Sequence, residues 1–152
     1  MIMNKGTIKQ IQMRVIKLLP KDKQPSIGIL CNDCCSEVSR LVASWIQEID
    51  KSSRLLILKG INVHGTQKSH DILAVLTSNN DVYIIDPTIW QFFPDKKSIL
   101  LCMSNNLEEA LKEIKEIYGG KWQISEEIFK ISTADREKYL NIISQTISEN
   151  LS

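Results

Sequence analysis

The chain has 152 residues, of which 43% are hydrophobic and 24% are charged, and its formal net charge is +1. This length fits one domain, residues 1–152, with a buried core. A net charge this close to zero argues against nucleic acid or an anionic membrane surface as partner. No apolar run approaches the ~18 residues that span a bilayer, and residues 1–20 lack the apolar centre of a signal peptide. The default expectation is a cytoplasmic protein, although delivery by a dedicated secretion machine fits the same composition.

The spacing of apolar residues predicts an α+β domain. A first helix runs from Ile8 to Leu19 and ends at Pro20, before a polar loop at 21–26. A second helix carries the strongest apolar stripe, from Val38 to Ile49. The later expected elements are strands at 55–63, 69–76, 82–86 and 98–102, a helix at 107–118 stopped by Gly119 and Gly120, an ambiguous segment at 122–131 and a helix at 133–151. Along the sequence, helices therefore come before and after an antiparallel run of strands, and this order is typical of the α+β class.

Three of the four cysteines are clustered at Cys31, Cys34 and Cys35. They extend the stripe of the second helix backwards, and Asn32 or Asp33 is its predicted N-cap, which places Cys34 and Cys35 in the first turn. Although Cys31 and Cys34 form a CxxC pair, a zinc site usually needs a second ligand pair at similar spacing. We therefore expect no metal and no cofactor, and thiols rather than disulfides in a reducing compartment.

A thiol at a helix start, a histidine and an aspartate form a candidate catalytic set. Unpaired N–H groups and the helix dipole favour a thiolate at Cys35. If Leu76 pairs with Val82 across the intervening turn, His70 and Asp86 project from the same face of the sheet as diagonal neighbours. A carboxylate there could bind one imidazole nitrogen and direct the other toward the thiol.

The strings that carry these residues are CSEVSRLV from Cys35, SHDILAV from Ser69 and VYIIDPTIWQF from Val82. Together they resemble the papain-like and transglutaminase-like superfamily, whose core has the same order of Cys-helix, His-strand and Asp-strand. Their intervals are similar to those of the small papain-like domains of bacterial toxins and effectors, several of which are protein glutamine deamidases. The resemblance covers about residues 28–93, and the helical part at about 105–152 lies outside it.

The resemblance assigns a role to each matching residue. The expected roles are nucleophile for Cys35, base for His70 and orienting carboxylate for Asp86. Cys35 is preferred because Val38 and Ser39 follow it at the family's spacing, and Cys31 and Cys34 stay open as alternative nucleophiles. Gln91, or a backbone N–H group at the helix start, is expected to stabilise the oxyanion.

These roles imply a thiol-dependent hydrolase that acts on an amide of a protein or peptide substrate, and a protein glutamine deamidase is favoured. A cysteine protease or a transglutaminase-type acyltransferase would use the same core. The alternatives from another class are a catalytically silent binding module and a thiol or metal sensor built on the clustered cysteines. The sequence leaves the oligomeric state open.

Overall fold

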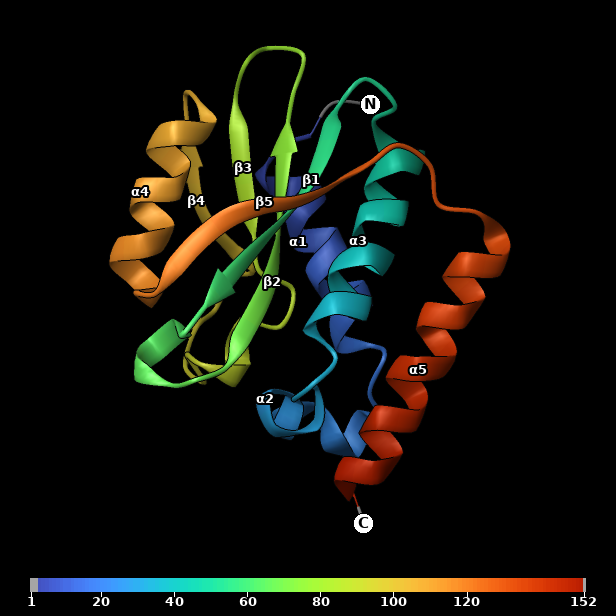
Figure 1. The fold of residues 1–152 in the computed structure, drawn as a ribbon. Helices are drawn as coiled ribbons and strands as arrows, with labels where there is room; N and C mark the ends of the chain where they lie inside the picture. The colour runs from blue at the N-terminus through green and yellow to red at the C-terminus, as the bar shows by residue number, and fades with distance from the viewer. Residues whose placement is uncertain (1–2, 152) are drawn as a thin grey trace.

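The computed structural model describes residues 3–151 as an α+β fold, which confirms the predicted class (Figure 1). Its centre is an antiparallel sheet in the order β4-β3-β2-β1-β5. The strands are β1 Arg54–Ile61, β2 Ser69–Leu76, β3 Val82–Ile85, β4 Leu100–Ser104 and β5 Lys121–Ile128. The α-helices are α1 Lys5–Ile16, α2 Ile27–Leu30, α3 Cys35–Ile49, α4 Leu107–Tyr118 and α5 Thr133–Leu151. Short 3₁₀ helices occur at η1 Lys21–Ser26, η2 Val63–Gly65 and η3 Ile89–Gln91.

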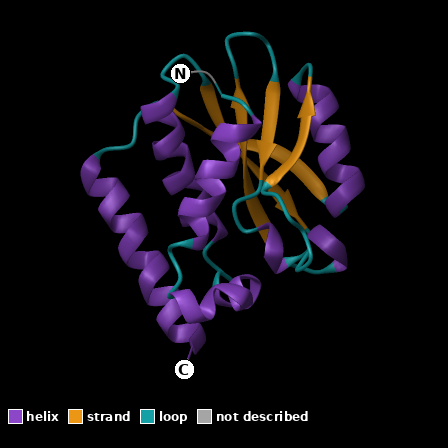
Figure 2. Cartoon of the chain, turned by 180° about the vertical axis from the view of Figure 1, so that it is seen from behind, coloured by secondary structure: helices purple, strands orange, loops and turns teal. Residues whose placement is uncertain are grey.

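Helices cover both faces of the sheet. The α1, α3 and α5 helices gather on one face and α4 lies on the other, as the two opposite views show (Figures 1 and 2). Because side chains alternate along a strand, Leu55 and Ile57 join the core beneath α3, whereas Leu56 and Leu58 join the core beneath α4. The sheet therefore separates two hydrophobic cores.

The register between β2 and β3 is the one predicted from the sequence. Leu76 lies opposite Val82, and the pairing ends with Leu73 opposite Ile85. Within the described sheet β3 ends there, but β2 extends back to Ser69 with β1 as its strand neighbour. The α3 helix packs against β2. The part of β2 that has no β3 neighbour therefore lies close to the start of α3.

The structure corrects the predicted start of the second helix. The α3 helix begins at Cys35 and its N-cap is Cys34, not Asn32 or Asp33. Asp33 has a left-handed φ of 68°, which a helix does not continue through. Cys31 therefore follows the separate short helix α2 and does not extend the stripe of α3. The result places Cys35 at the first helical position.

Other segments also differ from the expected boundaries, and β1 ends at Ile61 instead of Val63. The α1 helix ends at Ile16, and i→i−3 hydrogen bonds then carry the chain through Leu18 and Leu19. The segment expected as a polar loop forms η1 and leads directly into α2. The β4 strand begins two residues later than expected. The ambiguous segment at 122–131 contains most of β5, an edge strand whose mostly exposed side chains hide the usual strand alternation.

Two glycines end α4, as the sequence predicts. Gly119 and Gly120 have φ values of 67° and 75°, in the region that favours glycine. A Cβ atom on Gly120 would lie 2.3 Å from the carbonyl oxygen of Ile61. The turn after Tyr118 is therefore both conformationally and sterically restricted to glycine.

We expect Gly120→Ala to lower the free energy of unfolding by about 2–4 kcal/mol, because a backbone clash adds to the left-handed strain. Gly65→Ala is the matched control: its φ is 69° but no atom lies within 4 Å of the added Cβ. It should cost only the strain of about 1–2 kcal/mol. Equal losses in urea denaturation would contradict the close approach at Gly120.

Candidate active site

Cys35 occupies the first position of α3, where backbone N–H groups have no partner inside the helix. The first intrahelical hydrogen bond runs from Val38 N to Cys34 O at 3.0 Å. Cys35 is partly exposed, whereas Cys31 and Cys34 are buried at 1% and 0% exposure. Of the three clustered cysteines, Cys35 is the one that is not buried.

His70 and Asp86 form a buried pair. The Nε2 atom of His70 lies 2.7 Å from Oδ2 of Asp86, and the two side chains are 1% and 0% exposed. Burial acts to lower the pKa of His70, but the charge and hydrogen bond of Asp86, helped by Cys35, raise it to about 10. The pairing therefore favours the protonated form of the ring.

The Cys35 side chain lies near enough to the His70 ring to be one of the smaller causes of its raised pKa. The Nε2 atom of that ring is already engaged by Asp86. The Nδ1 atom is buried and has no hydrogen-bond partner among residues 3–151, so it is the ring atom still open to the thiol. The structure thus places His70 and Asp86 in direct contact and Cys35 near the ring.

Both oxygens of the Asp86 carboxylate take part in hydrogen bonds. Oδ1 accepts the backbone N–H of Thr88 at 3.1 Å and the Thr88 hydroxyl at 3.5 Å. Oδ2 accepts the hydroxyl of Tyr118 in addition to the His70 ring. The Asp-Pro-Thr string therefore forms a tight turn in which the carboxylate is fixed from both sides.

Tyr118 is the residue at this site that sequence reasoning missed. It ends α4, is 2% exposed, and places its ring centroid 5.6 Å from that of His70. Burial and the nearby Asp86 charge raise the pKa of Tyr118, so its hydroxyl stays protonated and donates. The sequence marks Tyr118 only as the last apolar residue before a Gly-Gly stop, and nothing local indicates that α4 covers this end of the sheet.

The second histidine is set apart from the pair. His64 is exposed, and its ring contacts Phe92 and Phe93 at centroid distances of 5.6 and 5.2 Å. Phe92 also meets the His70 ring edge-on at 4.8 Å. Aromatic side chains therefore enclose the His70 side of the site, and His64 lies at their outer edge.

Cys31 and Cys34 form hydrogen bonds with each other rather than with His70. The Cys34 thiol donates to the Cys31 carbonyl at 2.9 Å. Hydrogen bonding between the two thiols lowers the pKa of Cys31, and the same bond together with burial raises that of Cys34. The Cys34 thiol stabilises the turn that leads into α3, and neither Cys31 nor Cys34 is exposed as Cys35 is.

Two amide side chains hold the segment before Cys35 from opposite sides. Gln91 in η3 donates from Nε2 to the Cys31 carbonyl at 3.3 Å. Asn150 in α5 donates from Nδ2 to the carbonyls of Leu30 at 3.0 Å and Asn32 at 3.2 Å. The role of Gln91 as oxyanion donor stays a prediction, because its amide is engaged here with the Cys31 carbonyl.

Comparison of the chain with protein-family models, curated proteins and solved structures found no match. The site is therefore interpreted from its own geometry. Within residues 3–151, no group of three or more His, Cys, Asp or Glu side chains is arranged to hold a metal ion. No helix in that part of the chain is both long and apolar enough to cross a membrane.

The raised pKa of His70 predicts a pH-dependent contribution to stability. The pairing stabilises the fold fully below the ordinary histidine value of about 6.5 and is lost as pH rises through about 10. We expect Asp86→Asn to lower the free energy of unfolding by about 3–5 kcal/mol near pH 6, and by clearly less above about pH 10. Urea denaturation across this range measures the difference. The control is Glu127→Gln, at an exposed ion pair with Arg54, which should leave the free energy of unfolding almost unchanged. A loss in Asp86→Asn that does not vary with pH would argue against the pairing.

Removing the Tyr118 hydroxyl tests its bond to Asp86. We expect Tyr118→Phe to cost about 1.5–3 kcal/mol of unfolding free energy, because the lost bond is to a buried charged group. Tyr83→Phe is the control, since that buried hydroxyl donates at 3.4 Å to the neutral carbonyl of Met3; it should cost under about 1 kcal/mol. Similar small losses in both variants would mean that Tyr118 is a packing residue only.

Proposed function

We propose that this protein is a cysteine hydrolase with a papain-like core that acts on an amide of a protein substrate, most favourably as a glutamine deamidase. The observation that carries the proposal is the buried His70–Asp86 pair, whose Nδ1 atom has no hydrogen-bond partner among residues 3–151 and whose ring has Cys35 near enough to affect its pKa. An accessible thiol, a base and an orienting carboxylate are the parts that nucleophilic acyl transfer requires.

In the first half of the reaction, Nδ1 of His70 holds the proton of the Cys35 thiol while the sulfur attacks the carboxamide carbon. A C–S bond forms, and the carbonyl oxygen becomes an oxyanion that the free N–H groups of Cys35 and Ser36 can stabilise at the helix start. His70 then gives its proton to the leaving nitrogen. The C–N bond breaks, ammonia leaves, and a thioester remains on Cys35.

In the second half, His70 takes a proton from water as the water oxygen attacks the thioester carbon. The C–S bond breaks, the thiol is restored, and the glutamine side chain has become a carboxylate. Asp86 and Tyr118 take no part in bond making; they keep the ring in one orientation and stabilise its charged form. The same steps on a peptide bond would be proteolysis, and an amine in place of water would give transglutamination. The spacing of the three residues, which resembles that of the deamidases, favours the first reaction.

The first test is a short pulse of substoichiometric iodoacetamide at about pH 6, followed by peptide mapping. We expect Cys35 to be labelled at least about tenfold faster than Cys102, whose pKa burial and Glu113 raise to about 12. His70→Ala should abolish the preference. His64→Ala is the matched control and should leave it intact, because that exposed ring forms no bond with Asp86. Slow labelling of all thiols, unchanged in His70→Ala, would contradict the proposal and favour a binding module.

Turnover separates the three reactions. We would incubate the protein with unfolded, glutamine-containing proteins and measure ammonia release together with glutamine-to-glutamate conversion by mass spectrometry. Deamidation should require Cys35 and disappear in Cys35→Ser. Cleaved peptides would instead identify a protease, and incorporation of an added primary amine would identify an acyltransferase.

A further inference from the structure

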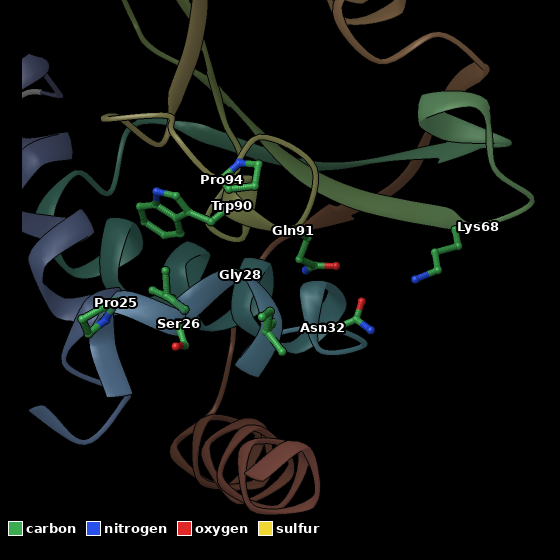
Figure 3. A pocket seen from close by; sticks show the side chains of 10 residues that line it. Pro25, Ser26, Gly28, Asn32, Lys68, Trp90, Gln91 and Pro94 are labelled. Carbon is green, nitrogen blue, oxygen red and sulfur yellow. The ribbon is translucent and has the colours of Figure 1, made fainter. Parts of the chain in front are cut away.

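A groove of about 450 Å³ lies beside the site and takes no part in the proposed bond-making steps. It runs between α2 and the segment around η3, and its two walls come from residues 25–32 and 90–94 (Figure 3). One end is apolar, with Pro25 and Trp90 (Figure 3). The other end carries the side chains of Asn32, Lys68 and Gln91 (Figure 3).

The polar end is the end nearest the triad. Asn32 precedes Cys35 by three residues, and Lys68 precedes His70 by two. Gln91 is bonded to the segment before Cys35 through the Cys31 carbonyl. When the target amide of a protein substrate lies at the Cys35 sulfur, the neighbouring residues of that substrate therefore lie next to this groove.

Both walls are held in place by the protein itself. Trp90 donates its indole N–H to the carbonyl of Lys96 at 2.8 Å, which fixes the loop after η3. Asn150 binds the carbonyls at the end of α2. Gly28 allows the two walls to approach, since a Cβ there would lie 2.3 Å from the Trp90 carbonyl oxygen. A groove that is already formed loses little entropy when it is filled.

The lining is chemically uneven. Lys68 is exposed, forms no ion pair within residues 3–151, and is the one charged residue among the described residues that line the groove. Ile29, in the wall formed by residues 25–32, is 73% exposed. The amides of Asn32 and Gln91 can exchange hydrogen bonds with an extended backbone. The apolar end of the groove, its single cation and its two amides match an extended peptide segment that has apolar and acidic side chains.

We propose that this groove binds the segment of the protein substrate adjoining the target amide, and that it selects segments carrying an apolar and an acidic residue. The proposal rests on the proposed function, because it needs Cys35 to be the reacting group. Lys68 is the specificity-determining residue, and the acidic side chain of the substrate is its ion-pair partner.

The test uses two peptide probes that react without turnover: bromoacetyl-Leu-Glu-Leu-amide and bromoacetyl-Leu-Lys-Leu-amide. In each, the Cys35 sulfur displaces bromide, so one S–C bond forms and one C–Br bond breaks. Intact-mass spectrometry with peptide mapping gives the rate at Cys35. We expect the acidic probe to label about two- to fivefold faster than the basic one, as one ion pair at the surface would produce.

Variants at exposed positions separate the possible outcomes. Lys68→Glu should reverse the preference once each peptide rate is divided by the iodoacetamide rate of the same variant, and Ile29→Asp should slow both peptide probes. Lys51→Glu, an exposed lysine just beyond the far end of α3, is the control and should change nothing. Rapid iodoacetamide labelling of Cys35 with no difference between the probes would overturn the groove proposal and leave the hydrolase proposal standing. Slow, His70-independent labelling would overturn both.

Discussion

The buried pairing of His70 with Asp86 is the constraint on which the rest of this structure depends. A charged pair that is 1% and 0% exposed survives only if its remaining hydrogen-bonding positions are also filled, because removing charge from water is costly. Thr88 and Tyr118 fill those positions on Asp86. The turn after β3 and the end of α4 therefore both help to keep the pair buried, while apolar residues such as Ala110 and Ile114 pack α4 against its face of the sheet.

Cys35 reaches this pair from the other layer of the molecule. His70 and Asp86 lie on the α4 side of the sheet by strand alternation, whereas α3 packs on the opposite side. The two meet because β2 extends beyond its pairing with β3, so that the sheet does not separate the helix start from the ring. The site thus sits at the place where the sheet ends and the two layers approach each other.

The parts of this arrangement that depend on local pattern could be predicted. Turn-forming residues between two apolar strands fix the register of Leu76 with Val82, and strand parity then places His70 and Asp86 on one face. The stop at Gly119 follows from backbone chemistry alone. The N-cap at Cys34 could not be predicted, because Asn32 and Asp33 are better capping residues by type and only the left-handed turn at Asp33 excludes them. Tyr118 and Asn150 act through contacts distant in sequence, which leave no periodic signal.

Those long-range contacts give the order in which the site can be assembled. Asn150 lies 118 to 121 residues away from the carbonyls it binds before Cys35. A ribosome releases the chain from its N-terminus, so the thiol leaves the exit tunnel well before the helices that fix its surroundings. Contacts that close such long loops also form slowly. The thiol is therefore synthesised early and positioned late. The site is complete only in chains whose α4 and α5 helices have already packed against the rest of the fold.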